Sequence, residues 1–227
     1  MNESTERIRK LTKRRWLVLA ASCLVNLCIG SLYAWSVFAP PMAAYLSSLT
    51  GITITAGNLA IAFAIANTVG PITMISGGYI NDRFGPKWVI FLGGLMYGSG
   101  FLVCGLSKSI GMVVLGFGVL CGLAVGLVYG CTVSNSVKFF PDRRGLIGGL
   151  TTASYGISSV IVPPVAGALI MNSGVLTAFR LLGAAFIIII SVSSFFIIKS
   201  PQNFIPYHWL IPGKGLVSGK ASANEDK

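Results

Sequence analysis

The chain has 227 residues, of which 54% are hydrophobic and only 10% are charged. Lys and Arg together number 17 and Asp and Glu only 6, so the net charge is +11. Water-soluble domains carry about 25% charged residues. The composition therefore excludes an ordinary soluble domain and indicates an integral membrane protein.

Six long segments of the chain are nearly free of charge. They run over Trp16–Ala39, Thr53–Ile80, Trp88–Leu106, Gly111–Val137, Gly145–Met171 and Thr177–Ile198. At a rise of about 1.5 Å per residue, each helix is long enough to cross a hydrocarbon core of roughly 30 Å. We predict an all-α integral membrane protein, a bundle of six transmembrane helices.

Prolines lie within two of these segments and directly after a third. We expect Pro40-Pro41 to end the first helix, because proline lacks the N–H group that a continuing helix needs. The uncharged stretch Tyr45–Thr55 then forms the return loop. Pro71 and the pair Pro163-Pro164 are expected to bend or locally unwind the second and fifth helices.

The basic residues predict the orientation. Of the 17, all but Lys108 and Arg180 precede the first segment, follow the sixth, or lie in the links after the second and fourth. The positive-inside rule then places both termini in the cytoplasm, in a multi-pass protein of the plasma (inner) membrane. Anionic lipid headgroups explain the basic charge, so no nucleic acid partner is needed. We divide the chain into a basic cytoplasmic N-terminus (1–15), a transmembrane domain (16–198) and a cytoplasmic tail or linker (199–227).

Two patterns of small and polar residues follow helical spacing. Gly118, Gly122, Gly126 and Gly130 form a stripe on the fourth segment, which favours close packing by a neighbouring helix. Polar residues share a face on three segments, which favours a hydrated seam over simple interhelical hydrogen bonds, although both alternatives stay open. These faces are Asn26, Gly30, Tyr33 and Val37; Val125, Tyr129, Thr132 and Ser136; and Gly148, Thr152, Tyr155, Ser159 and Pro163.

Several kinds of chemistry lack the residues they need. No Asp, Glu or Lys lies deep in any segment, so a proton relay through a buried carboxylate is not expected. The five cysteines all lie in apolar segments and the single histidine, His208, lies in the tail. We can assemble no nucleophile–base pair, metal-ligand cluster or cofactor loop from these residues. We therefore expect no enzyme, no cofactor and no metal site.

Two cytoplasmic links carry family motifs. Between the second and third segments, Gly78 is followed by Asp82-Arg83, Gly85 and Lys87, which resembles the signature loop of the major facilitator superfamily, although Pro86 replaces one of its basic residues. Between the fourth and fifth, Lys138–Leu146 resembles the Phe-Pro-Asp-Arg-Arg-Gly loop of the oxalate/formate antiporter family and, less closely, of monocarboxylate transporters. The runs Gly30–Phe38 and Pro201–Trp209 are also similar to that family.

The resemblance implies the N-terminal six-helix half of a transporter that moves a small organic anion such as oxalate, formate or a monocarboxylate by alternating access. It implies a second six-helix half, on the same or a separate chain, as partner. The alternative is a non-transporting membrane subunit or an inactive truncated remnant. Candidate cavity residues are Asn26, Tyr33, Tyr129, Thr152 and Tyr155, because hydroxyl and amide groups can contact a carboxylate without a buried charge. Candidate cytoplasmic gate residues are Gly78, Asp82, Arg83, Gly85, Lys87, Asp142, Arg143 and Arg144.

Overall fold

The computed structural model describes residues 3–201, and within that range every regular element is a helix. The α-helices are α1 (Glu3–Ile29), α2 (Trp35–Thr50), α3 (Ala56–Phe84), α4 (Pro86–Gly105), α5 (Ile110–Val113), α6 (Gly122–Phe139), α7 (Arg144–Ser173) and α8 (Val175–Phe196). A 3-10 segment, Gly30–Ala34, joins α1 to α2, and a π-helical segment, Val114–Cys121, joins α5 to α6. Residues 202–227, which hold His208 and most of the predicted tail, lie outside the described part.

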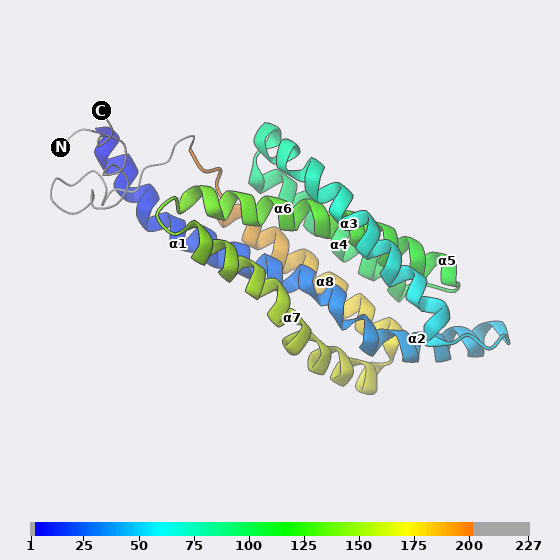
Figure 1. Ribbon diagram of the computed structural model, residues 1–227. Coiled ribbons are helices and arrows are strands. Elements are labelled where there is room, and N and C mark those ends of the chain that lie inside the picture. Colours follow the sequence, from blue (N-terminus) through cyan, green and yellow to red (C-terminus); the bar gives the residue numbers. More distant parts are fainter. Residues whose placement is uncertain (1–2, 202–227) are drawn as a thin grey trace, which may run out of the picture.

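Six helical stretches of the described chain are long and apolar enough to cross a membrane, which confirms the predicted bundle. They run over Arg9–Thr50, Ala56–Asn81, Pro86–Gly105, Ile110–Phe139, Arg144–Ser173 and Val175–Phe196. Figure 1 shows them lying side by side along one long direction, with the start of α1 and the end of α8 at the same end.

The prediction that Pro40-Pro41 ends the first helix is wrong. Both prolines lie inside α2, which continues to Thr50 and ends at Gly51, a residue with φ of +70°. Each proline removes one helix hydrogen bond, but Phe38, Met42 and Leu46 on this helix are fully buried. Their packing offsets the lost bonds, so much of the predicted loop Tyr45–Thr55 is helical instead.

The other prolines also leave their helices continuous. Pro71 lies inside α3 and Pro163-Pro164 inside α7, and neither helix is interrupted. Figure 1 shows α7 bending partway along its length. The prolines therefore bend rather than unwind α7, as expected where neighbouring groups accommodate the missing hydrogen bonds.

Glycines bring the helices of the bundle together. A Cβ added at Gly118 or Gly130 would lie 3.1 Å from a carbonyl oxygen of α3, and one added at Gly126 would overlap the Gly70 carbonyl and the Thr73 hydroxyl. This confirms the predicted packing stripe and identifies α3 as its partner. Glycines of α4 face α6 and α8 in the same way; they are Gly93, Gly94, Gly98 and Gly105.

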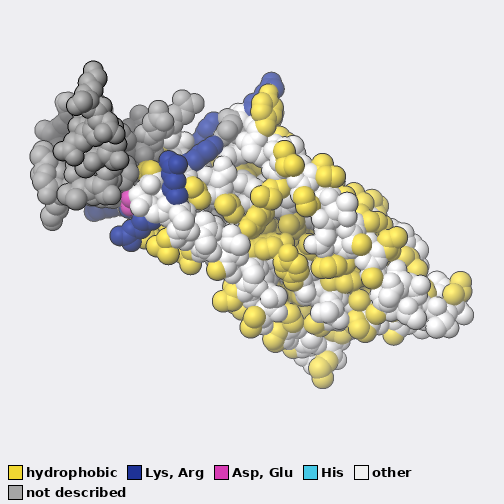
Figure 2. All heavy atoms as spheres, viewed as in Figure 1, with side chains coloured by type: hydrophobic (Ala, Val, Ile, Leu, Met, Phe, Trp, Pro, Cys, Tyr) yellow, Lys and Arg dark blue, Asp and Glu magenta, His cyan; other side chains and the backbone are white. Residues whose placement is uncertain are grey.

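The charges and the apolar surface separate along the bundle. Figure 2 shows the visible Lys and Arg side chains gathered toward the end that holds the start of α1, while hydrophobic side chains cover the remaining length. This distribution suits a protein with one headgroup-facing basic end. The cytoplasmic orientation of that end stays a prediction.

Candidate functional site

A cavity of about 340 Å³ lies between α3, α6, α7 and the 3-10 segment. Its size falls within the usual range of small-molecule pockets, about 300–1,000 Å³. Tyr33 is 44% exposed, although it lines the cavity, so the cavity opens to the surface instead of being sealed. The lining residues are Leu32, Tyr33, Ala66, Asn67, Gly70, Pro71, Met74, Val125, Gly126, Tyr129, Thr152 and Tyr155.

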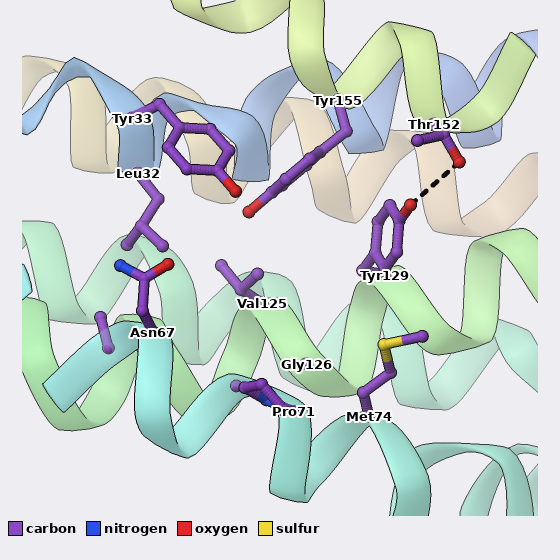
Figure 3. A pocket seen from close by; sticks show the side chains of 12 residues that line it. Leu32, Tyr33, Asn67, Pro71, Met74, Val125, Gly126, Tyr129, Thr152 and Tyr155 are labelled. Atoms are coloured by element: carbon purple, nitrogen blue, oxygen red, sulfur yellow. Dashed lines mark hydrogen bonds between the residues drawn. The ribbon is translucent and has the colours of Figure 1, made fainter. Parts of the chain in front are cut away.

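Three tyrosines from three different elements meet in this cavity. The ring centroid of Tyr155 lies 5.4 Å from that of Tyr33 and 5.0 Å from that of Tyr129. The Tyr129 hydroxyl and the Thr152 hydroxyl are 3.0 Å apart and share a hydrogen bond. Figure 3 shows the Tyr33 and Tyr155 hydroxyls pointing toward one another, across the cavity from Asn67, Pro71 and Met74. Four of the five predicted cavity residues are therefore brought together.

The local sequence explains how these side chains reach one cavity. Tyr33 belongs to the 3-10 segment, so it projects from a tighter turn than its α-helical neighbours. Tyr129 lies three residues after Gly126 of the glycine stripe, and Gly126 itself forms part of the lining. Thr152 and Tyr155 are spaced three residues apart and therefore share one face of α7.

Asn26 is the predicted cavity residue that the structure places elsewhere. It is fully buried, donates to the Thr151 carbonyl oxygen at 3.1 Å and accepts from the Thr132 hydroxyl at 2.7 Å. These contacts tie α1 to α6 and α7. Each of the two predicted alternatives for the polar faces therefore holds for some residues. The tyrosines line a cavity, whereas Asn26 forms interhelical hydrogen bonds.

The sequence reasoning missed the α3 wall of the cavity. Asn67, Pro71 and Met74 lie at spacings of three and four residues, so they share one face of α3. The second apolar segment carries two amide side chains, Asn58 and Asn67, and Asn67 lies four residues before Pro71. The spacing of Asn67 and Pro71 was the feature of the sequence that could have indicated this wall of the cavity.

The link between α3 and α4 is built on Gly85. This residue has φ of +82°, which favours glycine, and its N–H donates to the Asn81 carbonyl. A Cβ added at Gly78 would meet nothing within 4 Å among the described residues, so no neighbour packs closely against this glycine there. Gly77 is the residue that packs on α6, 3.3 Å from Leu127.

Two charged residues of this link, Arg83 and Lys87, contact aromatic rings. Lys87 Nζ lies 4.4 Å from the ring centroid of Phe195, and the Arg83 guanidinium lies 5.8 Å from that of Phe84. Asp82 lies on α3, but its side chain is outside the described part of the structure.

The link between α6 and α7 holds a buried ion pair that the sequence reasoning did not predict. Asp142 accepts from both terminal nitrogens of Arg15, at 2.9 and 3.4 Å, and the two side chains are only 10% and 7% exposed. The Arg15 guanidinium also lies 4.4 Å from the ring centroid of Phe140. The neighbouring Arg143 and Arg144 are exposed. Asp142 therefore fixes the start of the first span to this link.

The chemistry that the cavity offers is neutral hydrogen bonding. Its polar groups are the hydroxyls of Tyr33, Tyr129, Tyr155 and Thr152 and the amide of Asn67. One proton of the Tyr129–Thr152 pair is used in their mutual bond, and the other groups can donate to an anion. Among the side chains that the structure describes, no group of three or more His, Cys, Asp or Glu is arranged to hold a metal ion. The cavity is thus suited to bind a small polar molecule.

The chain is similar in sequence to known membrane transport proteins. The sequence profile of the Major Facilitator Superfamily matches residues 8–206. The chain is 30% identical to the oxalate:formate antiporter of Oxalobacter formigenes over 220 residues, which cover 96% of this chain and 51% of the antiporter.

Two further relatives match shorter regions. An uncharacterized MFS-type transporter, YhjX, of Escherichia coli is 36% identical over 149 residues (65% of this chain and 35% of the relative), and human monocarboxylate transporter 11 is 28% identical over 170 residues (74% and 35%). The chain thus spans about half the length of these curated relatives, or less. With a matching profile over most of its length and six helices able to span a membrane, the chain belongs to the Major Facilitator Superfamily.

Proposed function

We propose that this chain forms the N-terminal half of a secondary transporter for small organic anions such as oxalate, formate or a monocarboxylate, working by alternating access. The observation that carries the proposal is the cavity in which Tyr33, Tyr129 and Tyr155 meet. Phenolic hydroxyls donate hydrogen bonds to carboxylate oxygens, and bonds to a charged acceptor are stronger than neutral ones. The names of the antiporter and the monocarboxylate transporter among the relatives support this substrate class.

A second six-helix half is part of the proposal. The lining described above holds no Lys or Arg side chain to balance the charge of an anion. In transporters of this superfamily the substrate lies between two halves, so a second half would contribute the opposite wall and the compensating cation. In the most apolar stretch of α7 only 17% of the residues are buried, and in that of α3 only 28% are buried. These exposed faces support a partner surface on either side of the cavity opening.

The cytoplasmic links are proposed to form the inner gate. Asp82, Arg83 and Lys87 lie at or beside the α3–α4 turn, and Asp142, Arg143 and Arg144 lie at the α6–α7 link. Gly85 gives the first link its tight turn, and the Arg15–Asp142 pair gives the second a fixed anchor. Links held in this way suit a transport cycle in which one six-helix half moves as a rigid body against the other.

The test is oxalate counterflow in proteoliposomes. The purified chain alone is expected to catalyse no saturable exchange of oxalate or formate. A fusion of residues 1–201 to the second half of the Oxalobacter antiporter is expected to exchange labelled oxalate, and Tyr155→Phe in that fusion should slow the exchange. Tyr79→Phe is the matched control, because Tyr79 is 72% exposed and does not line the cavity.

Two outcomes would contradict the proposal. A fusion that inserts and folds, as judged by six-span topology and a monodisperse elution profile, yet exchanges no small carboxylate would reject the substrate class. Counterflow by the purified chain alone would reject the need for a separate second half.

A further inference from the structure

The 3-10 segment that carries Tyr33 is held by a hydroxyl outside the cavity. Tyr97 of α4 is fully buried, and its hydroxyl lies 3.1 Å from the Ile29 carbonyl oxygen and 2.7 Å from the Ser31 hydroxyl. A phenol has one proton to donate. Because Tyr97 donates it to Ile29, Ser31 donates to the Tyr97 oxygen. These two bonds span the junction at which α1 changes into the 3-10 segment.

The opposite side of the same segment is fixed by close backbone packing. A Cβ added at Gly30 would overlap the Tyr155 carbonyl and lie 2.7 Å from Cβ of Ser158. The segment is thus enclosed between α4, through Tyr97, and α7, through the backbone of Tyr155. Its position relative to α7 sets the position of the Tyr33 ring relative to the Tyr155 ring.

The ring of Tyr97 is held independently of its hydroxyl. Its centroid lies 5.3 Å from that of Phe101 and 5.7 Å from that of Phe186. Replacing Tyr97 by Phe therefore keeps the ring packing and removes only the hydrogen bonds to the segment. Two buried polar groups, the Ile29 carbonyl and the Ser31 hydroxyl, then lose this partner.

We propose that Tyr97 is a positioning residue for the tyrosine cavity, holding the Gly30–Ala34 segment so that Tyr33 faces Tyr155. Tyr97 does not line the cavity and acts only through the segment. As a statement about the anion site, this inference rests on the proposed function. The placement of Tyr33 itself is testable without any substrate.

The first test measures Tyr33's position in the full chain in lipid nanodiscs. Tyr33→Cys introduces a thiol, and the rate at which this thiol reacts with a membrane-impermeant maleimide is measured. Four of the five native cysteines are buried, and the chain without Tyr33→Cys gives the background labelling of the native cysteines. Adding Tyr97→Phe should change the rate about threefold or more, since a net hydrogen bond is worth a factor of about two to ten. Ser99→Ala is the matched control, because Ser99 donates only to Met96 of its own helix, and it should leave the rate unchanged.

Amide hydrogen exchange separates positioning from general loosening. Tyr97→Phe in the otherwise native chain should speed exchange at residues 30–35 and leave α8 as in the parent chain. Equal labelling rates for the two chains would overturn the proposal. Faster exchange throughout α4 and α8 would also overturn it, because Tyr97 would then serve general stability.

A second arm connects the positioning to the anion site. In the fusion described above, Tyr97→Phe should raise the KM for oxalate about tenfold with little change in kcat, whereas Ser99→Ala should alter neither. An unchanged KM would overturn the link to the site. If the fusion with native Tyr97 exchanges no oxalate, the proposed function fails, and the labelling result still decides whether Tyr97 positions Tyr33.

Discussion

Removing the charge of Asp142 should destabilise the chain, because the Arg15–Asp142 pair is nearly excluded from water. Asp142→Asn keeps the size of the side chain but leaves the Arg15 guanidinium, 7% exposed, without its carboxylate. Breaking a buried pair from one side costs about 3–5 kcal/mol. The Phe140 ring lies 4.4 Å from the guanidinium both before and after the substitution, so this cation–π contact does not change the loss. We therefore expect a loss of about 3–5 kcal/mol in the free energy of unfolding.

The assay is equilibrium unfolding in mixed micelles with increasing dodecyl sulfate, followed by the reaction of a fluorogenic maleimide with cysteines that become exposed. Cys28, Cys104, Cys121 and Cys131 are buried in the folded chain and so report its unfolding. An exposed pair supplies the matched control: Lys10 and Glu6 are 3.3 Å apart, with side chains 78% and 56% exposed. Glu6→Gln should change the stability by less than about 0.5 kcal/mol.

The double variant distinguishes the pair from its separate members. Arg15→Gln combined with Asp142→Asn removes both charges, so no isolated charge stays buried, and its cost should be well below the sum of the single costs. Strict additivity, or an Asp142→Asn chain as stable as the parent, would refute the reasoning that this link is anchored by the ion pair.

Three further predictions concern packing, orientation and the inner gate. Gly126→Ala should lower the free energy of unfolding by about 1–3 kcal/mol in the same assay, because its Cβ would overlap the α3 backbone. Gly149→Ala is the control and should be neutral, because a Cβ there meets nothing within 4 Å. Equal effects of the two substitutions would contradict a packing role for the glycine stripe. A cysteine replacing Ile52 should react with an impermeant reagent from outside the cell and one replacing Arg143 should not, and the reverse pattern would overturn the predicted orientation. Asp82→Asn, in the fusion, should insert normally but exchange oxalate several-fold more slowly, if loss of a charge–dipole contact of about 0.3–1 kcal/mol shifts the gate; unchanged exchange would reduce Asp82 to a topological role.

The six spans could be predicted from the sequence because they depend on local composition alone. Charge-free runs of this length have few alternatives to crossing a bilayer. The glycine stripe was predictable for the same reason, since helical periodicity places Gly118 to Gly130 on one face without knowledge of the neighbour. The identity of that neighbour, α3, required the structure.

Features that depend on distant contacts were not predictable. Pro40-Pro41 reads locally as a helix end, and only the buried positions of Phe38 and Met42 show why the helix continues. The partner of Asp142 is 127 residues away in the sequence. Asn26 shares a helix face with Tyr33, and spacing alone cannot tell that its amide bonds to Thr132 and Thr151 instead of lining the cavity.

The central claim is that the hydroxyls of the tyrosine cavity hold a small carboxylate. The most direct measurement is the equilibrium affinity for oxalate of the fusion transporter, with Tyr33, Tyr129 and Tyr155 replaced by Phe singly and together. A hydrogen bond to a charged group is worth about 1.5–3 kcal/mol, so the triple variant should bind oxalate at least about tenfold more weakly, while Tyr79→Phe should bind as the parent does. A triple variant that folds and binds oxalate with the parent's affinity would contradict the account.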